Sequence, residues 1–92
     1  MEMEKVWKTF EEKVLNTNCI SIPLTYIGSY IEIDGKKIRN CSIVLDFEEK
    51  NISLVSTSYG GYIIDDDYKP SAGECEKIVS LIERKSFFNQ IG

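Results

Sequence analysis

The stretch KKIRNCSIVLDFEEKNISLVST, residues 36–57, decides the fold class of this chain. Apolar and polar side chains alternate in both of its halves, which predicts one strand over about 37–47 and another over about 52–57. The residues between them, Glu48-Glu49-Lys50-Asn51, are polar and indicate a turn. The two strands are therefore expected to form an antiparallel hairpin.

Upstream of this hairpin, residues 26–33 predict a further strand, and Asp34-Gly35 after it is a strong signal for a tight turn. A two-residue turn would place Ile38 on the inner face, but strict alternation would then expose four large apolar groups: Cys41, Ile43, Leu45 and Phe47. A shift of the strand register by one residue turns every side chain to the opposite face. Burial of these four residues is therefore expected to be favoured over burial of Ile38. We therefore expect either a three-residue turn with Gly35 in the left-handed region or a bulge near Arg39-Asn40.

Two shorter segments complete the predicted sheet. Residues 19–24 alternate with period two, and Pro23 lacks the N–H that a central strand donates, which predicts an edge strand. Residues 62–64 follow Gly60-Gly61 and predict a short fifth strand. One sheet face is expected to stay open and to mix polar with apolar side chains, namely Tyr30, Glu32, Ser42, Val44, Asp46 and Val55.

Helices are predicted at both ends of the chain. Over residues 2–16, apolar side chains recur at steps of three and four, which predicts an amphipathic helix that buries Met3, Val6, Trp7, Phe10, Val14 and Leu15. A capping box, Ser71 to Glu74, begins a second helix that runs to about Ser86 and buries Cys75, Ile78, Val79 and Ile82. Residues 1–92 are thus expected to form a single two-layer α+β domain: an N-terminal helix, a four- to five-stranded antiparallel sheet and a C-terminal helix.

The composition excludes several function classes. Eleven Lys and Arg against fifteen Asp and Glu give 11 − 15 = −4, so direct binding to nucleic acid or to an anionic membrane is not expected. The absence of histidine removes the commonest general base and the usual zinc ligand. No apolar run reaches the roughly 18–20 residues of a membrane helix, so we expect a cytoplasmic protein. No cofactor is expected either, because the sequence has no phosphate-binding glycine motif.

The three cysteines are expected to be buried core residues. Cys19, Cys41 and Cys75 are odd in number, widely spaced and never in a Cys-x-x-Cys pair, so they indicate neither a disulfide framework nor a zinc site. Each occupies a position where a small apolar residue would fit. Slow alkylation of all three is therefore expected.

A tyrosine-rich acidic tract is the candidate partner-binding site. Its predicted contact residues are Tyr59, Gly60, Gly61, Tyr62, Asp65, Asp66, Asp67 and Tyr68. Tyrosine gives a large contact area at low entropic cost, which favours protein recognition. Neighbouring aspartates do not by themselves converge on a metal ion, so no metal site is predicted. The basic residues near the first predicted turn are interpreted as a solvent-exposed hairpin tip, namely Lys36, Lys37 and Arg39. The C-terminal apolar residues are expected to pack over the core, namely Phe87, Phe88 and Ile91.

These observations favour a non-enzymatic inhibitor or immunity-type factor that occludes a larger protein through the acidic tract. If that protein is a nucleic-acid enzyme, the acidity would compete for its basic cleft, by class-level analogy with phage-encoded antagonists of bacterial defence nucleases. The alternative is a self-associating structural or regulatory domain that forms a homodimer through the open sheet face or the Phe87-Phe88 segment. A third hypothesis is a small enzyme that works through carboxylates or a lone cysteine.

Overall fold

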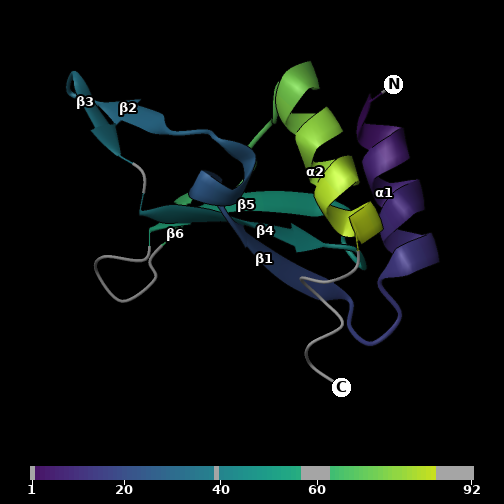
Figure 1. Ribbon diagram of the computed structural model, residues 1–92. Coiled ribbons are helices and arrows are strands. Elements are labelled where there is room, and N and C mark those ends of the chain that lie inside the picture. Colours follow the sequence, from purple (N-terminus) through teal and green to yellow (C-terminus); the bar gives the residue numbers. More distant parts are fainter. Residues whose placement is uncertain (1, 39, 57–62, 85–92) are drawn as a thin grey trace. The chain divides into compact units, whose positions relative to one another are not determined.

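The computed structural model describes residues 2–38, 40–56 and 63–84 (Figure 1). Its elements in chain order are α1 (Glu2–Lys13), β1 (Cys19–Pro23), the 3-10 helix η1 (Leu24–Ile27), β2 (Ile31–Ile33), β3 (Lys36–Ile38), β4 (Cys41–Asp46), β5 (Asn51–Ser56), β6 (Ile63–Asp65) and α2 (Ala72–Arg84). The predicted α+β class is confirmed, with a helix towards each end of the chain and antiparallel strands between them. The chain divides into two compact units, one holding the helices (Met1–Asn18 with Pro70–Gly92) and one holding the strands (Cys19–Lys69).

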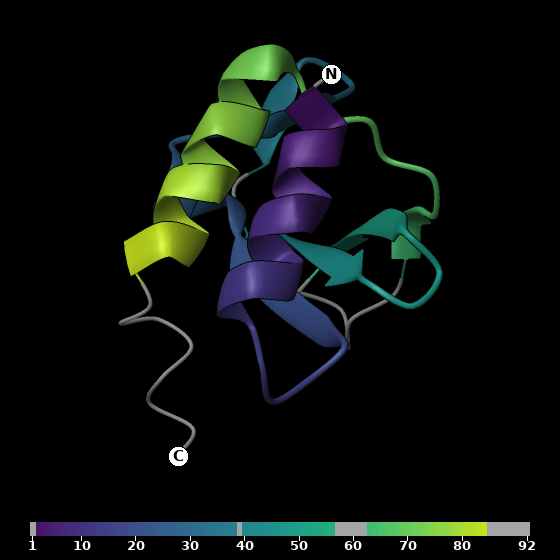
Figure 2. The ribbon, with the colours of Figure 1, turned by 90° about the vertical axis from the view of Figure 1, so that its right-hand side faces the viewer.

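In the helical unit, α1 and α2 lie side by side and run in the same direction (Figures 1 and 2). The buried positions of α2 are spaced three and four residues apart, as predicted, and comprise Cys75, Ile78, Val79 and Ile82, with Leu81 in addition. In α1, Val6 and Phe10 are buried one turn apart. The Cys75 thiol lies 3.6 Å from the Met3 thioether sulfur, which joins the first turns of the two helices.

The C-terminal end of α1 differs from the prediction. The helix ends at Lys13, three residues before the expected end, although the Val14 N–H still donates to the Phe10 carbonyl at 2.8 Å. Val14 is buried, but Leu15 is 77% exposed, so its predicted place in the core is wrong. The polar run that follows competes for the backbone and ends the helix early.

The predicted capping box of α2 is confirmed. The Ser71 N–H donates to Glu74 Oε1 at 2.9 Å, and the Glu74 N–H donates to Ser71 Oγ at 3.2 Å. These reciprocal bonds satisfy backbone donors that the first turn of a helix leaves without intrahelical partners. The start of α2 is therefore fixed by local sequence.

Replacing Ser71 with alanine is expected to lower the free energy of unfolding by about 1 kcal/mol, because the Glu74 N–H loses its acceptor. The melting temperature should fall by about 4–8 °C for a domain of this size. Ser80→Ala is the matched control, since Ser80 is exposed within α2 and should change stability by less than about 0.5 kcal/mol. Thermal unfolding followed by circular dichroism makes the comparison, and equal effects of the two variants would contradict the capping role.

The strands of the second unit form a four-stranded antiparallel sheet in the order β1-β4-β5-β6. The registers of β1, β4 and β5 align two rows of buried side chains on one face: Ile20, Leu45 and Ile52, and Ile22, Ile43 and Leu54. We call the opposite face the outer face. Four of the residues predicted for an open face, Ser42, Val44, Asp46 and Val55, lie on it. Tyr30 and Glu32 do not, because they belong to a different part of the unit.

The edges of this sheet agree with the sequence. Among the described strands, β1 pairs only with β4, and it ends at Pro23, which confirms the predicted edge strand. The predicted fifth strand is present as β6, shifted by one residue; Tyr62 lies outside the described residues. β5 ends at Ser56, and the β4–β5 turn occupies residues 47–50, with Lys50 at a φ of 55°.

The Asp34-Gly35 turn closes a separate two-stranded ribbon, β2–β3, rather than a part of the main sheet. Ile33 pairs with Lys36 across a two-residue turn in which both φ values are positive, 52° at Asp34 and 79° at Gly35. The predicted three-residue turn is therefore wrong. The single strand predicted over 37–47 is also wrong, because β3 ends at Ile38 and β4 begins at Cys41 in the other sheet. The register conflict is thus resolved because β3 and β4 are separate strands of different sheets, with Asn40 in a bend before β4; Arg39 lies outside the described residues.

The strand predicted over residues 26–33 is wrong in its first half. Leu24–Ile27 form η1, which Gly28 ends in the left-handed region at a φ of 66°. The Ser29 N–H donates to the Leu24 carbonyl at 2.9 Å, so the backbone turns before it can extend. Leu24 and Ile27 are buried by this turn.

Candidate protein-binding site

The candidate site is the acidic segment, which we define as Asp65, Asp66, Asp67 and Tyr68. Asp65 is the last residue of β6, and Asp66 and Asp67 form a bend directly after it. All three aspartates are exposed, whereas Tyr68 is half-buried. The other four predicted contact residues lie outside the described residues, namely Tyr59, Gly60, Gly61 and Tyr62.

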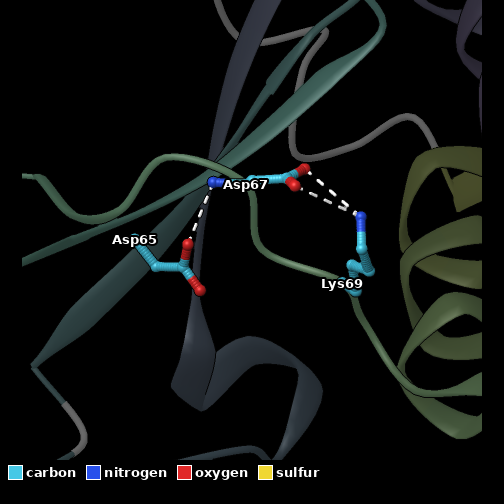
Figure 3. A network of polar contacts seen from close by, with 3 residues as sticks. All are labelled: Asp65, Asp67 and Lys69. Carbon is cyan, nitrogen blue, oxygen red and sulfur yellow. Dashed lines mark hydrogen bonds and ion pairs between the residues drawn. The ribbon is translucent and has the colours of Figure 1, made fainter.

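Local hydrogen bonds give the acidic segment a defined shape (Figure 3). The Asp67 N–H donates to Asp65 Oδ1 at 3.0 Å, which closes a turn through the side chain of the first aspartate. The Lys69 ammonium lies 3.3 Å from Asp67 Oδ2. Both side chains of this ion pair are exposed, so the pair contributes little to stability.

A backbone hydrogen bond joins the segment to the main sheet. The Tyr68 N–H donates to the Ile52 carbonyl at 2.8 Å, and Ile52 is a buried residue of β5. The acidic segment is therefore held at both ends, at Asp65 by strand pairing and at Tyr68 by this bond. A partner that binds the segment meets an ordered surface and orders little of it on binding.

The charge of the segment is unbalanced. Three carboxylates and the Lys69 ammonium leave a net charge of −2 within five residues. Figure 3 shows that the carboxylates of Asp65 and Asp67 point in different directions, and the second points toward Lys69. Among the described residues, no group of three metal-ligating side chains converges. The arrangement presents negative charge outward to solvent.

The cysteines divide into two kinds. Cys41 and Cys75 are buried, as predicted, but Cys19 is exposed, so its prediction as core is wrong. Cys19 occupies the outer face, which the period-two pattern alone does not distinguish from the buried face. Desolvation, followed by the charge of Asp46 opposite it on β4, raises the pKa of the Cys19 thiol. Burial also raises the pKa of the Cys41 thiol.

Cys19 is expected to react slowly with iodoacetamide despite its exposure, because the thiolate is the nucleophile and a raised pKa reduces its fraction at neutral pH. Its rate should rise with pH and reach the half-maximum at a higher pH than that of a free thiol. Asp46→Asn should accelerate labelling at a given pH, since it removes the second cause of the shift. The amide oxygen can still accept the Glu49 N–H that Asp46 Oδ1 accepts.

Peptide mass spectrometry follows the labelling of each cysteine separately. Glu48→Gln is the control, because Glu48 is an exposed carboxylate in the neighbouring turn. A Cys19 that reacts as fast as a free thiol at pH 7, or an Asp46→Asn variant without effect, would contradict this interpretation.

An open hollow of about 430 Å³ lies in the helical unit, lined by Glu4, Lys5, Lys8, Thr9, Glu12 and Glu83. Small-molecule sites are usually enclosed and mostly apolar, with a few convergent polar groups. This hollow is instead lined by charged side chains of both signs, and its Thr9 hydroxyl already donates to the Lys5 carbonyl at 2.7 Å. It therefore resembles a solvated helix surface more than an active site.

The structure shows a second group of candidate contact residues. Four large apolar side chains stay exposed in the strand unit, namely Tyr26, Tyr30, Ile33 and Ile63. Of these, only Tyr30 was predicted to lie on an open face. The Lys37 ammonium lies 4.7 Å from the centre of the Tyr30 ring.

Within the described ranges, no helix has the length and apolar content needed to cross a bilayer. None of the comparisons with family models, curated protein sequences and solved structures gave a match.

Proposed function

We propose that this chain is a non-enzymatic protein-binding domain that occludes a larger partner through the acidic segment. The observation that carries the proposal is the combination of exposure and order in that segment. Its three carboxylates face solvent, while the Asp65–Asp67 bond and the Tyr68–Ile52 bond fix the backbone that bears them. Fixed charges of one sign steer association and fix orientation.

The charge favours a partner with a basic surface. A net charge of −4 for the chain and of −2 for residues 65–69 disfavours nucleic acid and anionic lipid as direct ligands. Proteins that bind nucleic acid carry basic clefts, and an ordered anionic surface can compete with phosphate for such a cleft. We therefore propose a nucleic-acid enzyme as the partner. By analogy at the level of protein class, this chain would act as an antagonist of a bacterial defence nuclease.

The test is affinity capture followed by association kinetics. The triple variant Asp65→Asn, Asp66→Asn, Asp67→Asn removes three charges, while the amide oxygen at position 65 can still accept the Asp67 N–H. With the captured partner, its association rate should fall about tenfold or more at low salt, and the salt dependence should weaken.

A matched control removes three charges elsewhere. Glu4→Gln, Glu11→Gln, Glu12→Gln changes the net charge equally, at exposed positions of α1. A protein retained by the wild type and the control but released at lower salt by the triple asparagine variant supports the proposal. Equal association rates for the two triple variants would refute the role of the acidic segment.

Self-association is a second candidate function, and the outer face favours it. Val44 and Val55 are only half-buried on this face, and Ile63, which pairs with Val55, is 57% exposed. Apolar side chains of this kind on neighbouring strands form a surface that a second copy can cover. The other predicted dimer segment, Phe87, Phe88 and Ile91, lies outside the described residues. Sedimentation velocity over a range of concentrations tests this candidate.

A further inference from the structure

The β2–β3 ribbon has an apolar side. Cross-strand partners point to the same side of a ribbon, and Ile31 pairs with Ile38 while Ile33 pairs with Lys36. The register therefore places three isoleucines and one lysine together; we call this set the ribbon face. Ile33 is 42% exposed, and Ile31 and Ile38 are only half-buried.

In the described part of the chain, the two strands of the ribbon pair only with each other. A two-stranded ribbon with three residue pairs is marginally stable in water unless its apolar side is covered. The ribbon face thus has both exposed apolar area and an energetic reason to bind a surface. Lys36 on the same side favours a surface that carries negative charge near its apolar part.

A surface with these properties exists in the same unit, around β6 at the edge of the main sheet. Ile63 and Val55 are cross-strand partners, and the exposed residues Asp65 and Asp66 follow in the chain after Ile64. We call these four residues the edge patch. The tip of the ribbon and β6 lie apart in both views, so the ribbon face and the edge patch of one chain do not cover each other (Figures 1 and 2).

We propose that the ribbon face of one copy docks on the edge patch of a second copy, and that the contact is reciprocal. Ile33 and its neighbours would cover Ile63 and Val55, and the Lys36 ammonium would lie near the Asp65 and Asp66 carboxylates. This inference rests on the second candidate function, self-association, and names the surfaces that carry it. A chain that bears both halves of a complementary contact satisfies the condition for a two-fold dimer, in which each contact occurs twice.

Complementation between two variants tests the reciprocal contact. Ile33→Glu damages the ribbon face, and Ile63→Glu damages the edge patch, each at an exposed position. Either variant alone loses both contacts of the dimer, so its dissociation constant should rise about tenfold or more. A mixture of the two retains one intact contact, between the ribbon face of Ile63→Glu and the edge patch of Ile33→Glu. The mixed dimer should therefore be tighter than either variant dimer.

A charge exchange gives a second measurement that leaves the apolar residues unchanged. Lys36→Glu alone should weaken the dimer several-fold at low salt. Adding Asp66→Lys to the same chain should restore the affinity, because the two charges meet across the interface. Leu15→Glu is the control, since Leu15 is an exposed apolar residue of the other unit and should leave the dissociation constant unchanged.

Sedimentation equilibrium of each variant and of the mixture reads out the dissociation constants, with circular dichroism to confirm folding. A wild type that stays monomeric up to several hundred micromolar would overturn self-association and this proposal together. A wild-type dimer that neither Ile33→Glu nor Lys36→Glu weakens would overturn the docking of the ribbon and leave self-association standing. Weakened single variants without complementation would overturn the reciprocal arrangement.

Discussion

Phe10→Ala is expected to lower the free energy of unfolding by about 3–5 kcal/mol. Phe10 is 1% exposed, and its ring lies 6.2 Å from that of Trp7 between centroids, tilted by 51°. Removing the ring leaves a cavity in a small core, and the total stability of a domain is only about 5–15 kcal/mol. The variant should therefore be close to unfolding at 37 °C. Urea unfolding measures the change as a lower midpoint at an unchanged slope.

Leu15→Ala is the informative comparison for Phe10→Ala. The helical spacing of the sequence predicts both residues in the core, whereas Leu15 lies beyond the end of α1 and is almost fully solvated. Its replacement should change stability by less than about 0.5 kcal/mol. A loss of several kcal/mol for Leu15→Ala would mean that α1 continues to residue 16, as the spacing alone suggests.

The second large effect is expected at Ile43, at the centre of β4. Ile43 is fully buried and lies between Ile22 of β1 and Leu54 of β5. Ile43→Ala should lower the free energy of unfolding by about 2–5 kcal/mol, because the cavity opens between three strands. Equilibrium unfolding in urea, followed by tryptophan fluorescence and by circular dichroism, measures the change.

Val44→Ala tests the register of the same strand. Val44 is the next residue along β4, points to the outer face and is half-buried. Its truncation should cost less than about 1 kcal/mol, since part of the side chain already contacts water. If Val44→Ala were the more destabilising of the two, β4 would be shifted by one residue and its faces exchanged.

The elements that could be predicted from the sequence are those determined by interactions within a few residues. The capping box of α2 needs only Ser71 and Glu74, and the tight turn at Asp34-Gly35 needs only two residues that accept positive φ. The β4–β5 hairpin likewise follows from two alternating runs on either side of a polar turn. For the capping box and the β4–β5 hairpin the local signal and the packing agree; at Asp34-Gly35 the position of the turn was predicted, but its two-residue type was not.

The errors arise where the tertiary structure decides between two acceptable local conformations. Thr25, Tyr26 and Ile27 are β-branched or aromatic and favour a strand, yet they lie in η1, which Gly28 ends in the left-handed region. The conflict around Ile38 was visible in the sequence, but its solution was not. Both predicted solutions, the three-residue turn and the bulge, assumed one continuous strand, whereas β3 belongs to the ribbon and β4 to the main sheet.

The candidate site, like the fold, could be predicted only in its local features. An aspartate run before a proline indicates an exposed loop, and the exposure of Asp65, Asp66 and Asp67 is confirmed. The hydrogen bond from Tyr68 to Ile52 joins residues sixteen positions apart, and no local pattern predicts it. The exposure of Ile63 could not be predicted either, because an alternating strand gives no indication of how many neighbours it has.

The two margins of the main sheet have a consequence for behaviour at high concentration. At one margin, β1 ends in Pro23, which has no N–H to offer an incoming strand. At the other, β6 is three residues long, has an irregular register with β5 and ends in Asp65. Such margins resist the strand-by-strand addition that builds cross-β fibrils. Concentrated solutions of the folded protein should therefore remain free of thioflavin-positive fibres.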